Sequence, residues 1–251
     1  DQLILTNQDG FLFFDILKEL KKSPYRKENY VLTEAGEIEY HEDGKSIGIK
    51  GIDISKYNGE IDWEKVAASG VHFAYIRAGI RGYGSGEIVK DETFDDNMEK
   101  AAMAGLEVGV YFFTQAINEE EAIEEADFVM ECIQDKYVSC PIALDLEYVS
   151  GATSTPRATN ISQEQHTKNA IAFCERLKEK GYTPIIYGNM RTFLCMLDMT
   201  KLEDYQKWYA GYISKDAITP YFPYEFRIWQ YKSTGKVDGI TGDVDLDIAF
   251  Y

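Results

Sequence analysis

Two carboxylates separated by one residue follow a short apolar run in the middle of the chain. Asp145 and Glu147 stand in the segment Ala143-Leu144-Asp145-Leu146-Glu147-Tyr148. Successive side chains of an extended strand point to opposite faces, so these two carboxylates point the same way. Like charges on one face of a buried strand cost free energy unless they have a partner or a task. Paired carboxylates in a pocket are the usual equipment for cleaving a glycosidic bond.

The two acids are expected to divide the work of such a cleavage. Glu147 is the candidate proton donor for the departing sugar oxygen, because ionised Asp neighbours would disfavour its anion and raise its pKa. Asp145 would stay ionised and stabilise the positive charge that develops at the anomeric carbon. Acids at strand ends also cap helices or bind loop amides, so the pair alone leaves a structural interpretation open.

The elements that position this pair follow a regular pattern from Gly48 onward. Apolar strand-like runs alternate with amphipathic helical stretches, which predicts a parallel sheet covered by helices. The expected strands are 49–54, 71–78, 106–114, 142–147, 183–187, 207–212, 226–231 and 244–250. The expected helices are 63–69, 94–104, 119–136, 162–180 and 190–197, with Ser162-x-x-Gln165 as a start signal and Gly181 as a stop.

Eight strands in this order predict an irregular α/β barrel of TIM type. The last strands leave little room between them, so we expect helices to be missing in the final third. The alternative is a doubly wound open sheet, which usually carries a glycine-rich phosphate turn after its first strand. Here that strand continues instead into Ser55-Lys56-Tyr57.

The first 47 residues read differently from the rest of the chain. We expect residues 1–47 to form a small N-terminal extension on a catalytic barrel of residues 48–251. The apolar segment 11–17 predicts a short helix. The segments 30–32 and 38–40, with turns at Ala35-Gly36 and Asp43-Gly44, predict a β-hairpin.

Composition and charge exclude several classes of function. The formal net charge of −17 argues against nucleic acid and anionic membrane surfaces as partners. Three separated His residues, and four Cys residues without a CxxC, predict no metal site and no cofactor. No stretch is long and apolar enough to span a membrane. The chain opens at Asp1 without an initiator Met, so we expect an export or anchor segment to be missing from it.

Further acids stand on the first and last predicted strands, which are neighbours in a closed barrel. Asp53 lies near the end of the first strand, and Asp243, Asp245 and Asp247 lie on the last. Asp53 and Asp245 are predicted to complete an acidic ring around one cavity with the first pair. The last-strand acids are also compatible with a solvated edge or with the cation site of a metal-dependent hydrolase.

Taken together, several short segments resemble glycoside hydrolase family 25, the muramidases also called Chalaropsis-type lysozymes. The segments occur in the family's order and spacing, and the resemblance covers roughly four-fifths of the chain, from Gly48 onward. They are Gly51-Ile52-Asp53-Ile54-Ser55-Lys56-Tyr57-Asn58-Gly59, Ile61-Asp62-Trp63, Phe73-Ala74-Tyr75-Ile76-Arg77-Ala78-Gly79, Gly109-Val110-Tyr111-Phe112-Phe113, Ala143-Leu144-Asp145-Leu146-Glu147, Ile186-Tyr187, Trp208-Tyr209-Ala210, Ile228-Trp229-Gln230-Tyr231 and Val244-Asp245-Leu246-Asp247.

The resemblance implies hydrolysis of the β-1,4 bond between N-acetylmuramic acid and N-acetylglucosamine in peptidoglycan. The family's acidic cluster maps onto Asp53, Asp145, Glu147 and Asp245. Glu147 matches the proton donor, and Asp145 matches the residue that assists the substrate's own 2-acetamido group as internal nucleophile. That route implies net retention, although the sequence leaves inversion and direct attack open.

Other positions are assigned with explicit alternatives. Tyr111, Tyr187 and Trp208 are predicted substrate contacts, with core packing as the alternative. Arg77 is expected to bind a site carboxylate or substrate, with an ordinary salt bridge as the alternative. The family commonly has Val-Asp-x-Asn near its end, whereas this chain has Asp247 at the Asn position. The added charge would either shift the pH optimum or point away without effect.

The resemblance also implies a setting for the protein. We expect a secreted or surface-attached bacterial enzyme that acts as a monomer on peptidoglycan glycan strands, with no protein partner implied. The alternative from another class is a peptidoglycan-binding barrel that has lost catalysis. The four acids argue against it, because a binding role does not need such a set.

Overall fold

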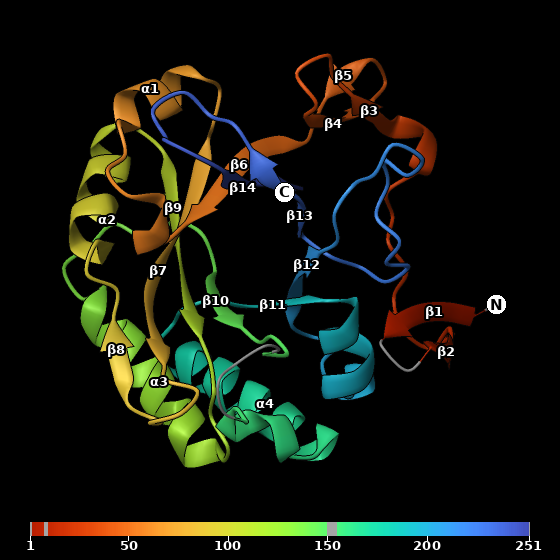
Figure 1. The fold of residues 1–251 in the computed structure, drawn as a ribbon, viewed down its shortest axis with the longest axis vertical. Coiled ribbons are helices and arrows are strands. Elements are labelled where there is room, and N and C mark those ends of the chain that lie inside the picture. Colours follow the sequence, from red (N-terminus) through yellow and green to blue (C-terminus); the bar gives the residue numbers. More distant parts are fainter. Residues whose placement is uncertain (1, 8–9, 150–154, 251) are drawn as a thin grey trace.

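Eight strands of the computed structural model close into a barrel (Figure 1). The structure describes residues 2–7, 10–149 and 155–250. The strand order is β6-β14-β13-β12-β11-β10-β9-β7, and β7 pairs with β6 to complete the ring. The strands are β6 (Ile49–Ile54), β7 (Phe73–Arg81), β9 (Glu107–Phe113), β10 (Ile142–Asp145), β11 (Pro184–Asn189), β12 (Gln206–Ala210), β13 (Ile228–Gly235) and β14 (Val244–Ala249). A short additional strand, β8 (Ile88–Lys90), pairs antiparallel with the end of β7.

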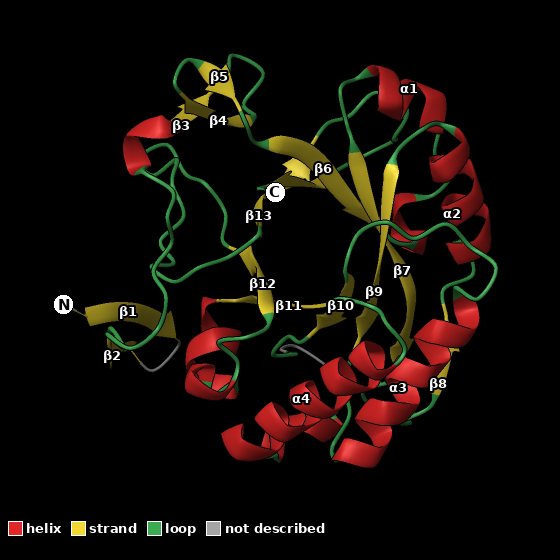
Figure 2. Cartoon of the chain, turned by 180° about the vertical axis from the view of Figure 1, so that it is seen from behind, coloured by secondary structure: helices red, strands yellow, loops and turns green. Residues whose placement is uncertain are grey.

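The helices surround the first part of the barrel (Figure 2). They are α1 (Trp63–Ala68), α2 (Phe94–Met103), α3 (Glu119–Cys132) and α4 (Gln163–Glu179). Ser162 caps α4 by accepting a hydrogen bond of 3.1 Å from the Gln165 backbone N–H, as the Ser-x-x-Gln signal predicts. Gly181, with a φ of +85°, follows the end of α4 in a conformation that favours glycine.

The last third of the barrel lacks long helices, as the sequence predicts. Among the described residues after α4, the helical segments are short: the π-helix η4 (Thr192–Met196) and the 3₁₀-helix η5 (Met199–Lys201). Earlier 3₁₀ turns are η1 (Lys27–Asn29), η2 (Lys56–Asn58) and η3 (Arg157–Asn160). None of the helices formed by the described residues combines the length and apolar character that a membrane crossing requires.

Strand β14 runs antiparallel to both of its neighbours, which corrects the prediction of a wholly parallel sheet. Only residues 236–243 connect β13 to β14. A parallel return needs a crossover of about a dozen residues or more, so this connection allows only a reversal. As a result Asp245, near the start of β14, lies opposite Asp53, near the carboxyl end of β6.

Bulky side chains fill the inside of the barrel. The inner cluster consists of Phe73, Tyr75, Ala143, Ile185, Tyr187, Trp208, Ala210, Ile228 and Ala249. Gly51 on β6 permits this filling, because a Cβ atom there would lie 2.1 Å from the ring of Phe73. A second, larger apolar cluster lies between the strands and the surrounding helices and includes residues of the N-terminal segment, such as Tyr30 and Tyr40.

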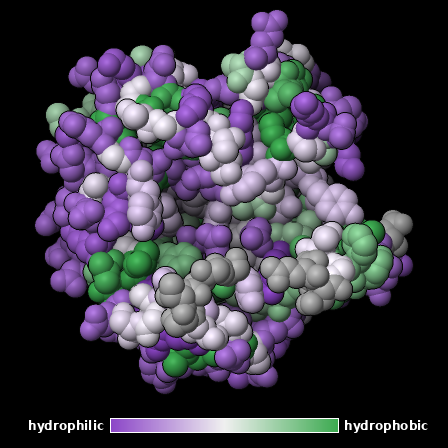
Figure 3. Space-filling view, in the orientation of Figure 1, coloured by the Kyte–Doolittle hydropathy of each residue, from purple (hydrophilic) through white to green (hydrophobic). Residues whose placement is uncertain are grey.

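Two small sheets precede the barrel. β1 (Gln2–Asn7) and β2 (Gly10–Asp15) form an antiparallel hairpin, and β3 (Tyr30–Leu32), β4 (Ile38–Glu42) and β5 (Lys45–Ser46) form a three-stranded sheet. The short helix predicted over 11–17 is therefore wrong. Aromatic runs favour strands, and β1 supplies a partner at every position of β2. Phe11 and Phe13 are 66% and 61% exposed, and apolar side chains gather on this hairpin (Figure 3).

The residues that follow the β1–β2 hairpin pack against the C-terminal part of the barrel domain. The Ser23 N–H donates to the Pro223 carbonyl over 2.9 Å, and the Glu225 N–H donates to the Lys21 carbonyl over 3.0 Å. The ring of Tyr25 stacks on Phe250 with 3.9 Å between centroids. The predicted extension includes residues 1, 8 and 9, which lie outside the described residues, as do 150–154 and 251 of the predicted barrel.

Candidate active site

All eight predicted site residues line one cavity of about 400 Å³ at the carboxyl ends of the parallel strands. They are Asp53, Arg77, Tyr111, Asp145, Glu147, Tyr187, Trp208 and Asp245. Further lining residues are Tyr57, Ile80, Tyr83, Phe113, Val149, Tyr212 and Gln230. The strands of the ring bring these side chains together from distant parts of the sequence. Their roles remain predictions.

The carboxyl groups of Asp145 and Glu147 interact with each other at the end of β10. Asp145 is the last residue of the strand and is buried, whereas Glu147 is partly exposed. The Leu146 N–H still donates to the Tyr187 carbonyl, over 3.3 Å, so the chain keeps its extended direction past the strand end. The alternation of side chains is thereby preserved, and both carboxyl groups face the cavity, as the sequence predicts.

Burial favours the protonated forms of Asp145 and Glu147. Burial raises the pKa of Glu147, and burial together with the charges of Glu147 and Asp53 raises the pKa of Asp145 well above its ordinary range, against the opposing effect of Arg77. The sequence predicts an ionised Asp145, whereas these surroundings favour its protonated form when no substrate is present. Because Glu147 is the partly exposed member, it is the one that can pass a proton into the cavity.

Gln230 connects the acids to the tyrosines of the cavity, and the sequence prediction missed it. Its Nε2 donates to Asp53 Oδ2 over 2.7 Å. Its Oε1 accepts from the Tyr187 hydroxyl over 2.9 Å and from the Tyr212 hydroxyl over 3.1 Å. The two hydroxyls fix the orientation of the amide, which then presents its N–H group to Asp53. A buried polar residue in an otherwise apolar strand was the available signal.

Asp245 and Asp247 are separated by one residue on β14, so both side chains lie on its inner face. Burial, with the charges of Asp53 and Glu147, raises the pKa of Asp245 to about 8. Asp247 is 0% exposed, and its Oδ1 accepts a hydrogen bond of 2.8 Å from Trp208 Nε1. The carboxyl group of Asp247, which replaces the family's usual Asn, therefore points into the barrel interior. The alternative that it points away from the site is wrong.

The aromatic residues that line the cavity differ in how much of their ring surface is exposed. Trp208 is 1% exposed, and its ring lies 4.4 Å from Tyr75 and 4.9 Å from Tyr187 between centroids, so core packing accounts for most of its surface. Tyr57 and Tyr212 are 80% and 57% exposed at the cavity and offer more ring surface for stacking on a sugar. Neither was predicted, although Tyr57 stands within the first family segment.

Arg77 is held by a partner outside the acid cluster. Its Nε and Nη2 atoms lie 2.9 Å and 2.8 Å from Asp91 Oδ2, and its guanidinium lies 5.2 Å from the ring centre of Tyr57. The carboxyl of Asp91 also accepts from the backbone N–H groups of Lys56 and Thr93 over 3.1 Å and 3.0 Å. The salt-bridge alternative is thus realised, while Arg77 still lines the cavity.

Replacing Asp91 with Ala is expected to lower the free energy of unfolding by about 2–4 kcal/mol, because a mostly buried Arg77 and two N–H groups lose their acceptor. Urea unfolding measures this loss. The matched control is Asp96→Ala, which breaks an exposed pair with Lys100 on α2 and should change the free energy of unfolding much less. Equal effects of the two substitutions would contradict the anchoring role of Asp91.

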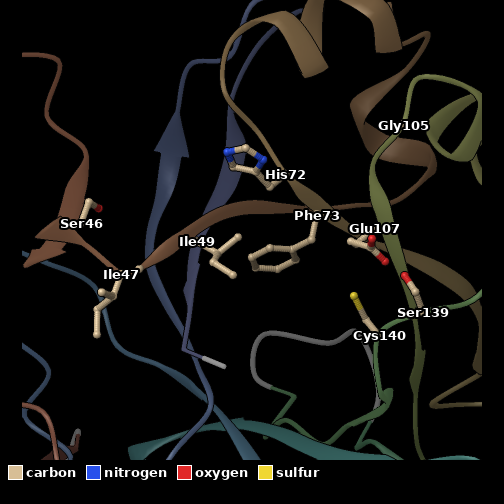
Figure 4. A pocket seen from close by; sticks show the side chains of 10 residues that line it. Ser46, Ile47, Ile49, His72, Phe73, Gly105, Glu107, Ser139 and Cys140 are labelled. Carbon is tan, nitrogen blue, oxygen red and sulfur yellow. The ribbon is translucent and has the colours of Figure 1, made fainter.

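A larger cavity of about 650 Å³ lies at the opposite end of the barrel (Figure 4). It is lined where β6, β7 and β9 begin, by residues that include Ile49, Phe73, Glu107 and Cys140. None of the predicted site residues lines it. Function in α/β barrels gathers at the carboxyl ends of the strands, so the smaller, acidic cavity is the candidate active site.

A metal site would need several ligands that converge on one point. Within residues 2–7, 10–149 and 155–250, no group of three or more His, Cys, Asp or Glu side chains is arranged to hold a metal ion. The metal-dependent alternative therefore finds no ligand set in the described part of the chain.

Comparison with known proteins places these features in a family. Residues 52–240 match the model of glycosyl hydrolases family 25. The chain is 30% identical over 200 residues to an autolytic lysozyme of Clostridium acetobutylicum, covering 79% of this chain and 55% of that protein. It is 28% identical over 207 residues to lysozyme M1 of Streptomyces globisporus, covering 79% and 66%. The chain thus spans between half and two thirds of the length of these relatives.

Solved structures share the fold. The bacterial lysozyme from Streptomyces coelicolor superposes with a TM-score of 0.64 at 26% identity, covering 80% of this chain and 91% of that one. The modular autolysin LytC from Streptococcus pneumoniae gives a TM-score of 0.70 at 23% identity, covering 98% and 61%. The second match extends over the N-terminal sheets as well as the barrel and concerns the fold alone.

Proposed function

Because the chain belongs to glycosyl hydrolase family 25, we propose that it is a muramidase that cleaves the β-1,4 bond between N-acetylmuramic acid and N-acetylglucosamine in peptidoglycan. The observation that carries the proposal is that partly exposed Glu147 and buried Asp145 line one acidic cavity, where burial favours a protonated carboxyl group. Relatives named as lysozymes support the substrate.

In the proposed reaction, Glu147 gives its proton to the glycosidic oxygen as the bond to the anomeric carbon breaks. The oxygen of the substrate's 2-acetamido group attacks that carbon from the opposite face, and its N–H donates to Asp145. This contact favours the Asp145 anion, so the proton that the pair shares resides on Glu147 when it is needed. Glu147 then takes a proton from the water that opens the cyclic intermediate, which gives net retention.

The neighbouring groups orient this machinery. Gln230 holds Asp53 through a hydrogen bond of 2.7 Å, and Asp245 lies opposite Asp53 on the adjoining strand. We assign Asp53 and Asp245 to the orientation of Asp145, Glu147 and the substrate, which their position in the cavity supports. The exposed rings of Tyr57 and Tyr212 are proposed to stack on sugar units. The predicted contacts Tyr111, Tyr187, Trp208 and Arg77 line the same cavity and are proposed to touch the substrate there, although Trp208 offers little exposed surface.

The wider setting belongs to the same proposal. The protein acts outside the cell or at its surface as a bacterial enzyme, since peptidoglycan lies there, and it acts as a monomer. Residues 1–47 serve as an extension of the barrel domain of residues 48–251. The ring of Tyr25 stacks on Phe250, which supports an extension that packs directly on the barrel.

Incubation with purified cell walls tests the proposal against the rival function of a non-catalytic binding barrel. A muramidase releases soluble fragments with new reducing ends, and the turbidity of the wall suspension falls. A binding module sediments with the walls and releases none. Sedimentation without any increase in reducing ends would therefore favour the rival.

The rate of wall hydrolysis is expected to fall as the pH rises. Glu147 must carry a proton, and its raised pKa means that the protonated form persists above the ordinary Glu value of about 4.3 and is lost at higher pH. A profile of kcat/KM against pH measures this limb. A rate that increases steadily from acidic to alkaline pH would contradict Glu147 as the proton donor.

A further inference from the structure

Asp247 lies between Trp208 and Asp53 inside the barrel. Its Oδ1 accepts the indole N–H of Trp208 over 2.8 Å, and its Oδ2 is buried without a donor among the described residues. Asp247 stands two residues along β14 from Asp245, the register partner of Asp53, so the side chains of Asp247 and Asp53 are diagonal neighbours on one face of the barrel wall, and their carboxyl groups interact there. Ionised carboxylates only accept hydrogen bonds, so a contact between two of them requires a proton.

Asp53 is held from its other side as well. Gln230 donates to Asp53 Oδ2 over 2.7 Å, and two tyrosine hydroxyls fix the amide that does so. The indole N–H of Trp208 and the amide N–H of Gln230 thus donate to opposite ends of the carboxyl pair, and together they stabilise one negative charge on it. A second negative charge between these ends would be buried next to the first, which is costly. One proton for two carboxyl groups satisfies the arrangement.

Other titratable groups face the pair from each neighbouring strand, and most of them are acidic. Asp245 approaches Asp247 along β14, and Glu147 approaches Asp53 from the end of β10. The phenols of Tyr231 on β13 and Tyr111 on β9 interact with Asp247 and Asp53 respectively. The cation of the cavity, Arg77, is bound to Asp91. Burial and these acids raise the pKa of both members of the pair well above the ordinary value.

We propose that Asp53 and Asp247 share a single proton, and that Asp247 is a positioning residue which holds Asp53 at the active site through this bond. The proton leaves to solvent at high pH. Two adjacent buried anions then repel each other, and Asp53 loses its fixed position. The consequence for catalysis rests on the function proposed above, whereas the shared proton itself does not.

The substitution Asp247→Asn provides the matched variant. The new Oδ1 would accept from Trp208, and the new Nδ2 would donate to Asp53, so both hydrogen bonds persist without a proton that titrates. Asp247→Leu has a similar size but removes the acceptor and the donor together. The comparison between these variants separates the shared proton from simple packing.

The indole N–H resonances of the ¹⁵N-labelled full chain report on the pair without any substrate. In the wild type, the Trp208 resonance is expected to shift with a midpoint well above the ordinary Asp value of about 3.9. Trp63 and Trp229 donate to the Asn97 side chain and the Gly211 carbonyl, which do not titrate, and serve as internal controls. Asp247→Asn should reduce the Trp208 shift to that of the controls.

Cell-wall hydrolysis supplies the second readout. At about pH 5, Asp247→Asn should stay within about threefold of the wild type, and Asp247→Leu should lose about 10²-fold. The ratio of the Asp247→Asn rate to the wild-type rate should then rise by about tenfold toward alkaline pH.

Two results would overturn the inference: a wild-type Trp208 resonance that is flat or has an ordinary Asp midpoint, or a rate ratio that stays constant with pH. If the Leu variant does not fold, the resonance and the ratio still decide. If Trp208 titrates as expected but the wild type hydrolyses no cell wall, the carboxyl pair stands and the proposed function fails.

Discussion

Glu147→Gln is expected to lower the rate of cell-wall hydrolysis by about 10³-fold or more, because the leaving sugar oxygen then receives no proton. Glutamine keeps the size of the side chain and can still hydrogen-bond to Asp145, so the cavity should keep its shape. Glu147 is also partly exposed, so its replacement should hardly change the melting temperature. The release of reducing ends from purified walls measures the rate.

Two controls separate the loss of the proton donor from a general effect of the substitution and from a loss of wall binding. Glu99→Gln changes an exposed glutamate on α2, away from the cavity, and should leave the rate unchanged. Sedimentation of Glu147→Gln with insoluble walls should persist, because the exposed rings of Tyr57 and Tyr212 are intact. Undiminished hydrolysis by a correctly folded Glu147→Gln protein would remove Glu147 from the mechanism.

Asp145→Asn is expected to lower kcat by about 10²–10³-fold with a smaller effect on KM, because the neutral amide no longer favours the positive charge on the reacting acetamido group. The variant carries a second signature. The side-chain amide that this substitution introduces can donate to Glu147 permanently and stabilise its anion, which lowers the pKa of Glu147. The alkaline limb of the residual activity should therefore move to lower pH.

This shift separates a direct role from a structural one. A substitution that merely loosened the end of β10 would lower the rate equally at every pH. A wild-type rate, or a reduced rate with an unmoved alkaline limb, would contradict the assignment of Asp145 as the partner of both the substrate and Glu147. Circular dichroism of the variant confirms that the barrel is intact in either case.

Local patterns in the sequence predict most of the barrel. Strands such as β6 and β10 are apolar runs, and helices such as α4 begin and end with recognisable signals, so their order alone indicates a closed ring. The ring then predicts that Asp53, Asp145, Glu147 and Asp245 meet, and all four line one cavity in the structure. The residues belong to strands whose neighbours follow from chain order.

The features that were missed depend on connections and pairings that the composition of a single segment does not specify. The direction of β14 follows from the short connection before it and not from its own composition. The segment Gly10–Asp15 becomes a strand because β1 lies beside it, although its apolar run is equally compatible with a helix. Gln230 and Asp247 matter through the partners that the closed barrel gives them, Asp53 and Trp208, and no local pattern specifies those pairs.

Mass analysis of chemically reduced fragments from digested peptidoglycan identifies which glycosidic bond the enzyme cuts. We expect fragments that end in reduced N-acetylmuramic acid, produced by the wild type and absent with Glu147→Gln. Fragments that end in reduced N-acetylglucosamine, or the absence of fragments from active walls, would contradict this expectation.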